Sequence, residues 1–138
     1  MNKAAADIKK AGMQLGYHNH NFEFKKVSGK PGYDILLAEA DPNLVKMEMD
    51  LYWTIKGGAD PLKYFAKYPG RFPLVHVKDM DQSGDFAEVG SGTIDWQAIF
   101  AKSQEAGIKH YFVEQDQSTD PFASIETSYR YLRDLRFA

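Results

Sequence analysis

The amino-acid sequence predicts an α/β fold of four consecutive βα units preceded by one helix. Short apolar runs typical of buried strands alternate four times with segments of helical composition. This alternation implies parallel strands joined by right-handed crossovers. The chain has 138 residues, whereas a closed (β/α)8 barrel typically needs about 250. The pattern therefore fits an open doubly wound sheet or half of a barrel, and the side chains discussed below favour the half-barrel.

The first expected elements are a helix and a strand. Residues 2–11 are rich in Ala and Lys, which favour a helix, and Gly12 ends the segment. "MQLGYHNH", residues 13–20, predicts the first strand. A Gly/Pro-rich turn, "SGKPG", leads into an expected helix over residues 33–40. The apolar run "LVKMEMD", residues 44–50, then predicts a short buried strand.

The second half begins with a clear helix start signal. Asp60 is a good N-cap and Pro61 suits the first helical position, so a helix is expected over residues 60–68. The last helix opens with the same Asp-Pro pair. The other expected elements are the strand 72–79, the long loop 80–92, the helix 93–107, the strand 109–116 and the helix 120–138.

Composition narrows the function classes. The chain is 43% hydrophobic, enough for one compact domain over residues 1–138, and no linker or repeat divides it. The 17 basic and 19 acidic side chains are mixed along the sequence, which argues against nucleic-acid and membrane partners. No apolar run approaches the roughly 20 residues of a membrane span. The absence of cysteine excludes disulfides and thiolate chemistry and is compatible with a cytoplasmic location.

Ionisable residues end all four expected strands. Successive side chains on a strand point to opposite faces, so each strand has a mainly apolar face and a face that becomes polar towards its carboxyl end. The polar ends carry His18 and His20, Asp50, His76 and Glu114. In a barrel, catalytic groups project inward at this end. We expect these groups to converge, and a mixed nitrogen and oxygen donor set suits a divalent ion such as Mn²⁺, Co²⁺, Zn²⁺ or Mg²⁺.

Several of these ionisable residues also have structural explanations. Asp50 could cap the turn that follows it. Glu48 is expected to partner a histidine or lysine rather than bind a metal. Glu23 lies past the first strand, where a solvated loop position is expected. His110 enters its strand from the opposite end and Arg71 precedes its strand, so both are expected to be structural. Agreement among four strand ends, rather than any one residue, favours the metal site.

Five motifs resemble, in order, those of the sugar phosphate isomerase/epimerase superfamily, the xylose isomerase-like TIM barrels. They are "YHNHNFEF", "MDLYW", "GRFPLVHVKD", "VGSGTIDW" and "YFVEQD". The resemblance covers essentially the whole chain and matches it to strands five to eight of the family's barrel. The motifs are specific for the superfamily and leave the substrate open.

The resemblance implies a divalent metal held by Glu, Asp, His and Glu from those four strands. By position, Asp50, His76 and Glu114 match the last three ligands. The first departs from the family pattern, because the usual glutamate falls at or near His18. His18, His20 or Glu23 could replace it, with His18 first by alignment.

The implied chemistry is proton transfer next to a carbonyl of a sugar, keto-sugar or polyol, with the metal chelating the carbonyl and an adjacent hydroxyl. Glu114 is expected to ligate the metal and move the proton, and His20 or Glu23 to fill the second acid–base role. Lys78 could steady an oxyanion or a phosphate, or form a structural ion pair. Trp53 is expected to wall the pocket.

The resemblance also implies a missing half. A lone half-barrel exposes two sheet edges and an apolar interior. We expect either that a second copy closes an eight-stranded barrel, or that the chain is a fragment completed by an N-terminal partner. Two functions follow. One is a metal-dependent sugar isomerase, epimerase or related lyase, and the other is an inactive half-barrel that retains metal binding and self-associates.

Overall fold

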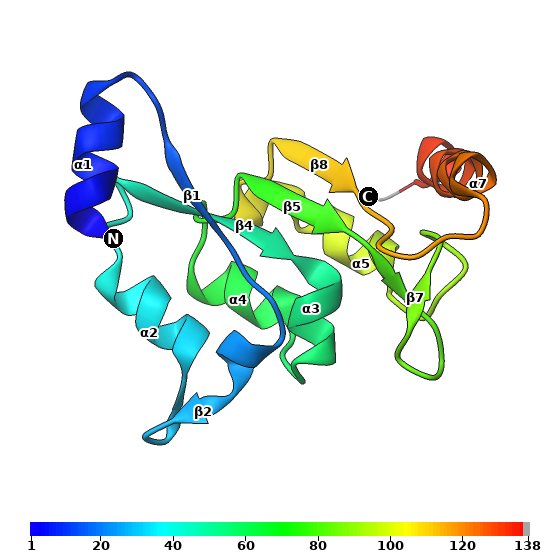
Figure 1. Ribbon diagram of the computed structural model, residues 1–138, viewed down its shortest axis with the longest axis horizontal. Helices are drawn as coiled ribbons and strands as arrows, with labels where there is room; N and C mark the ends of the chain where they lie inside the picture. The colour runs from blue at the N-terminus through cyan, green and yellow to red at the C-terminus, as the bar shows by residue number, and fades with distance from the viewer. Residues whose placement is uncertain (137–138) are drawn as a thin grey trace.

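The computed structural model describes residues 1–136 and shows half of a (β/α)8 barrel (Figure 1). Four parallel strands form one sheet in the order β1-β4-β5-β8, so each new strand is added at the same side of the last. The expected four-stranded parallel sheet is confirmed. Its strands are β1 (Leu15–His18), β4 (Val45–Asp50), β5 (Leu74–Val77) and β8 (His110–Val113).

Helices lie in every connection between successive strands of the sheet, and one further helix precedes β1 and one follows β8 (Figure 1). Four of the helices begin at an aspartate that caps the first turn, at Asp50, Asp60, Asp95 and Asp120. The helices are α1 (Asn2–Lys10), α2 (Gly32–Glu39), α3 (Leu51–Lys56), α4 (Pro61–Lys67), α5 (Trp96–Ala101), α6 (Ser103–Ala106) and α7 (Pro121–Asp134).

Strand alternation divides the sheet into a dry face and a polar face. Met47, Met49, Val75 and Val77 are 0% exposed and pack against the helices. The residues between them on each strand point the other way, and this second face is only half-buried. In the parallel register, Asp50 pairs with His76. The polar ends of neighbouring strands therefore meet at one edge of the sheet, as the sequence predicted.

Three connections differ from the sequence expectation. The segment after Asp50 forms α3, which no helix signal had marked. The expected helix 93–107 is two short helices, because Lys102 adopts non-helical dihedrals between α5 and α6. The expected loop 80–92 contains part of an antiparallel pair, β6 (Asp79–Met80) and β7 (Phe86–Ala87). Short β2 (Lys26–Val27), β3 (Lys30–Pro31) and the 3-10 helix η1 (Phe22–Phe24) complete the described elements.

The last strand and the last helix leave apolar side chains in solvent. Tyr111 and Val113 on β8 are 45% and 46% exposed. The sequence predicted that this apolar face of the strand would be buried under helices, and that prediction is wrong for β8. On α7, Phe122, Ile125 and Tyr129 are 60–86% exposed. Figure 1 shows α7 standing beyond β7 rather than beneath β8. Residues 137 and 138, which the sequence assigned to this helix, lie outside the described residues.

Among residues 1–136, none of the helices combines the length and apolar character needed to cross a bilayer.

Candidate active site at the carboxyl ends of the strands

The two carboxylate oxygens of Asp50, the last residue of β4, have different surroundings. Oδ1 accepts a 2.8 Å hydrogen bond from the backbone N–H of Trp53 and so caps α3. Oδ2 is buried and, within the described part of the chain, accepts no hydrogen bond. Burial raises the pKa of this carboxyl above its ordinary value, while the Trp53 N–H and the Lys78 ammonium act in the opposite direction. Oδ2 forms an ion pair with Lys78 Nζ at 3.4 Å, which compensates part of its charge. A buried oxygen that still lacks a hydrogen bond is typical of a site that receives a ligand.

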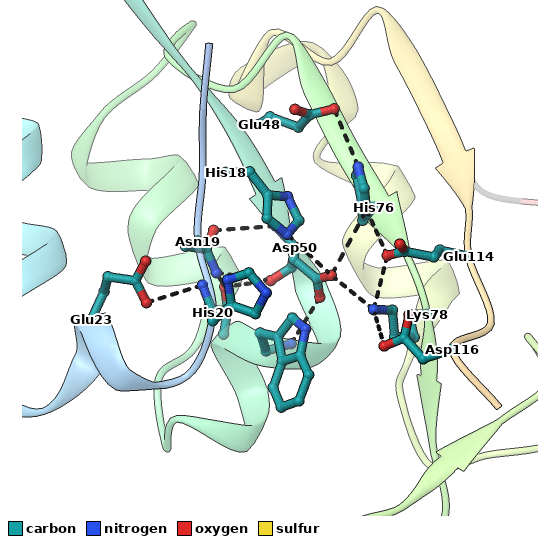
Figure 2. A network of polar contacts seen from close by, with 12 residues as sticks. His18, Asn19, His20, Glu23, Glu48, Asp50, His76, Lys78, Glu114 and Asp116 are labelled. Atoms are coloured by element: carbon teal, nitrogen blue, oxygen red, sulfur yellow. Dashed lines mark hydrogen bonds and ion pairs between the residues drawn. The ribbon is translucent and has the colours of Figure 1, made fainter. Parts of the chain in front are cut away.

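Two histidines lie around that oxygen (Figure 2). His18 Nε2 is 4.0 Å and His76 Nδ1 is 3.9 Å from Asp50 Oδ2. One donor atom from each of the three residues lies within 4.8 Å of the others. Burial, with the neighbouring His76 and His20, lowers the pKa of His18. A neutral imidazole offers a lone pair to a metal, so His18 is suited to that role at neutral pH.

Glu48 and Glu114 each contact one of the two nitrogens of the His76 ring. Nε2 lies 3.2 Å from Glu48 Oε1 and Nδ1 lies 2.7 Å from Glu114 Oε2. The structure thus shows the histidine partner that the sequence predicted for Glu48. It also places Glu114 outside the group of three donor atoms, because its oxygen is directed at His76 Nδ1 rather than at the space beside Asp50.

Lys78 is a buried lysine whose ammonium contacts three carboxylates, of which Asp50 is buried and Glu114 and Asp116 are partly exposed. Its side chain is 2% exposed, and Nζ lies 2.8 Å from both Glu114 and Asp116 and 3.4 Å from Asp50. Burial alone would raise the pKa of Glu114, but hydrogen bonds from Lys78 and His76 outweigh it and lower that pKa to about 2. Burial likewise opposes the charge of Lys78, and its carboxylate partners more than compensate, so its pKa is raised.

Aromatic rings surround the Lys78 ammonium. Nζ is 5.5 Å from the ring centres of Trp53 and Phe86 and 5.9 Å from that of Tyr52. These distances allow cation–π attraction. Trp53 also lies 5.6 Å from the His20 ring. Trp53 therefore lies between Lys78 and His20, and its role as a wall of a substrate pocket stays a prediction.

Glu23 is not the solvated residue that the sequence predicted. It is 7% exposed, accepts a 2.8 Å hydrogen bond from the Tyr17 hydroxyl, and accepts a 3.0 Å bond from the backbone N–H of His20. Figure 2 shows its carboxylate directed at the His20 backbone, away from Asp50. The backbone turns into η1 directly after the strand, and this turn brings Glu23 back under it. The buried carboxylate thereby fixes the segment that presents His20.

His20 lies at the mouth of the cluster. Its ring is 5.1 Å from the ring of His18 and stacks 5.8 Å from that of Phe22. It is exposed, unlike His18. His110, at the opposite end of β8, and Arg71, whose guanidinium faces backbone carbonyls of Leu37, Ala40 and Val45, lie away from these residues. Both positions agree with the structural roles expected for them.

Asp79, directly after Lys78, anchors the loop beside the site. Its carboxylate is 0% exposed. Gly92 lies so close that a Cβ there would meet Asp79 Oδ1 at 2.2 Å, so only glycine fits. Five N–H groups donate to the carboxylate at 2.8–3.3 Å, from Met80, Gly90, Gly92, Ile94 and the Trp96 indole.

Sequence reasoning missed three contributors to this region: Asp116, Asp79 and Phe86. Asp116 follows Glu114 by two positions, so strand alternation could have placed both near Lys78. Asp79 ends a strand just before a Gly-rich loop, a position where a carboxylate can collect backbone N–H groups. Phe86 offered no comparable signal, because its place depends on the β6–β7 pair.

Comparison with known proteins decides the family. The family described as "Xylose isomerase-like TIM barrel" matches residues 1–135. The chain belongs to this family. It is 27% identical to inosose dehydratase of Lacticaseibacillus casei and 26% identical to that of Clostridium perfringens, with 90% and 97% of the chain aligned.

Solved structures in this family share the fold. A sugar phosphate isomerase/epimerase from Parabacteroides distasonis superposes with a TM-score of 0.85 at 36% identity over 96% of this chain. A probable 3-DHS dehydratase from Bacillus anthracis superposes with a TM-score of 0.74 at 13% identity, which supports the fold alone. The chain covers 48% of the L. casei enzyme and 49% of the P. distasonis chain, so it spans about half the length of these relatives.

Proposed function

We propose that this chain supplies the metal-binding half of an isomerase or epimerase, or a related lyase, that abstracts a proton next to the carbonyl of a sugar or keto-sugar. One observation carries the proposal: the buried Asp50 Oδ2, which accepts no hydrogen bond, lies 4.0 Å from His18 Nε2 and 3.9 Å from His76 Nδ1, and the three residues come from three adjacent strands. The family relationship supports the reaction class, since the relatives are named inosose dehydratase and sugar phosphate isomerase/epimerase.

The donor set fits a divalent ion. Imidazole and carboxylate together suit Mn²⁺, Co²⁺ or Zn²⁺, and Mg²⁺ is the harder alternative. His18, Asp50 and His76 would hold the ion. A ring nitrogen cannot donate to a carboxylate and bind a metal at once, so His76 Nδ1 would bind only after losing its 2.7 Å contact with Glu114, which would also free Glu114 to join the donors. When bound, such an ion supplies Lewis-acid polarisation of a carbonyl. This role makes the hydrogen on the adjacent carbon more acidic.

Glu114 is the proposed proton acceptor. Its pKa of about 2 shows that it is ionised at neutral pH but weakly basic while Lys78 and His76 both donate to it. Loss of the His76 contact would raise that pKa and make the carboxylate a stronger base. Lys78 is placed to donate to an oxygen that gains negative charge, and Trp53 to exclude water. His20, exposed at the mouth, is the proposed second proton-transfer group.

A second (βα)4 unit is the proposed partner. The edges β1 and β8 are the ends of the open sheet, and exposed apolar side chains stand on β8 and α7. The relatives are about twice as long as this chain. We propose that either a second copy or a separate N-terminal half pairs with these edges. Light scattering at micromolar concentration tests the first possibility, and a stable monomer would count against it.

The alternative function is metal binding without turnover. It is favoured by one observation, namely that the three proposed metal donors lie in this chain while the relatives are about twice as long. Titration with Mn²⁺, followed by electron paramagnetic resonance, measures the binding. Exchange of substrate hydrogen for deuterium in D₂O, over a panel of ketoses and keto-cyclitols, measures proton abstraction. Binding with exchange supports the enzyme, binding alone supports the alternative, and absence of binding contradicts both.

A further inference from the structure

A large cavity adjoins the proposed site and is not used by the proton transfer. Its volume is about 870 Å³, and it lies between the β6–β7 segment and the start of α7. Two residues belong to both regions: Asp116, which bonds Lys78 at 2.8 Å, and Phe86, whose ring lies over the same ammonium. A ligand that reaches Lys78 therefore has this cavity beside it.

The lining is acidic and rich in hydrogen-bonding groups. No lysine, arginine or histidine is among the described residues that line it. The nearest cations already have carboxylate partners, since Lys78 contacts three and Lys56 lies 4.0 Å from Asp85. The polar lining residues are Asp85, Glu88, Asp116, Asp120, Gln115, Gln117, Ser118, Thr119, Ser124 and Thr127.

A carboxylate of the protein already caps the start of α7, where an anion would otherwise bind. In (β/α)8 enzymes a phosphate commonly binds near the end of the eighth strand, at the N–H groups of a helix start. Here Pro121 has no N–H, and the N–H of Ala123 donates to the carboxylate of Asp120 at 3.1 Å. The negative charge that this helix start attracts is thus supplied by the protein itself.

We propose that this cavity is a subsite for an uncharged, hydroxyl-rich part of the sugar substrate, and that it excludes phosphorylated sugars. Carboxylate, amide and hydroxyl groups can pair with sugar hydroxyls, and the ring of Phe86 offers an apolar surface to the sugar's C–H groups. A phosphate would meet uncompensated negative charge instead. The proposal builds on the proposed sugar-converting function and narrows its substrate class.

Saturation-transfer NMR of the full chain tests the discrimination. The probe is an equimolar mixture of D-glucose, D-fructose, myo-inositol and their monophosphates, without added metal, so that chelation by phosphate plays no part. We expect saturation of at least one neutral sugar and a signal about tenfold weaker from its phosphate, which corresponds to a difference of about 1.4 kcal/mol in binding free energy. Equal signals, a stronger phosphate signal or no neutral-sugar signal would each overturn the proposal.

Matched variants locate the binding. Thr127→Trp fills the cavity from an exposed position on α7 and should abolish the sugar signal. Glu126→Trp places the same ring one residue away, outside the lining, and should retain it. Asp120→Ser keeps a capping hydroxyl but removes the charge, so combined with Glu88→Lys it should admit the phosphates. A sugar signal that survives Thr127→Trp, or continued exclusion of phosphate in the double variant, contradicts the assignment.

Failure of this subsite can be distinguished from failure of the proposed function. Mn²⁺ affinity depends on His18, Asp50 and His76 and should be the same in Thr127→Trp and in the parent chain. Loss of sugar binding with intact Mn²⁺ binding reports on the cavity alone. Lack of Mn²⁺ binding in the parent chain reports on the proposed function alone.

Discussion

The indole Nε1 of Trp96 donates a 2.8 Å hydrogen bond to Oδ2 of Asp79, and both residues are 0% exposed. This bond links the start of α5 to the start of β6. Four backbone N–H groups donate to the same carboxylate, so the Gly-rich loop is anchored beside the site.

Replacing Asp79 with Asn should destabilise the fold. An amide retains one acceptor oxygen and directs an NH₂ group at N–H donors, so at least two buried donors lose their partner in either orientation. We expect a loss of about 2–4 kcal/mol in the free energy of unfolding, measured with urea. The control is Asp60→Asn, at the N-cap of α4, where Asn caps equally well. Similar losses in the two variants would refute the special role of Asp79.

Asp50→Asn separates metal binding from folding. The amide oxygen can still accept from Trp53, so α3 keeps its cap. The buried charge at Oδ2 disappears. Because burial raises the pKa of Asp50, its ionised form opposes folding at neutral pH, and the variant should melt no lower than the parent. Mn²⁺ affinity should fall by about 10–100-fold. A lower melting temperature with unchanged Mn²⁺ affinity would identify Asp50 as purely structural.

Glu114 should contribute to acid sensitivity. Its folded-state pKa of about 2 lies below the ordinary value of 4.5, so the unfolded chain takes up this proton first as pH falls. The stabilisation is complete above the ordinary value and disappears as pH falls from there towards the folded-state value. Glu114→Gln should therefore flatten the fall of the urea midpoint across this window. Glu126→Gln, in an exposed pair with Arg130, should leave that fall unchanged.

His18 should add a second acid-sensitive step at higher pH. Its folded-state pKa is lowered from the ordinary value of 6.5, so the unfolded state binds the proton first and stability falls as pH drops below that value. NMR titration of the His18 ring measures the shift, and the His18→Gln variant should lack this step. An unshifted titration would show that the ring is better solvated than its position implies.

Lys78→Met should make the stability of the protein depend more strongly on added Mn²⁺. Removal of the ammonium leaves Asp50, Glu114 and Asp116 without their shared positive charge, and breaking such a buried pair typically costs about 3–5 kcal/mol. Added Mn²⁺ should then raise the melting temperature of the variant more than that of the parent chain. Equal increases would show that Lys78 and the metal donors do not share an electrostatic environment.

The sheet and the polar strand ends followed from the sequence because both depend on local pattern. Alternation along β4 and β5 places Asp50 and His76 on the same face, and parallel register then brings them together. The roles of individual atoms did not follow. That Oδ1 of Asp50 caps α3 while Oδ2 has no partner depends on the dihedral angles of one turn, which residue type alone does not determine.

Tertiary contacts account for most of what the sequence missed. Glu23 is buried because η1 folds back beneath β1. It accepts a hydrogen bond from the hydroxyl of Tyr17, a residue on the opposite face of β1 from His18. The expected helix 93–107 breaks at Lys102, where neither a glycine nor a proline signals an end. The exposed face of β8 also could not be foreseen, because alternation predicts which side chains share a face and not what covers it.

Because Asp79 immediately follows Lys78 and also fixes the loop that returns from Phe86, the ammonium and the aromatic ring over it are tied to one short stretch of backbone. Exchanges at the tip of this segment, around Gln82 and Ser83, are thus insulated from the metal donors. Natural variation at this tip can therefore change the shape of the loop while the proposed metal donors His18, Asp50 and His76 keep their positions.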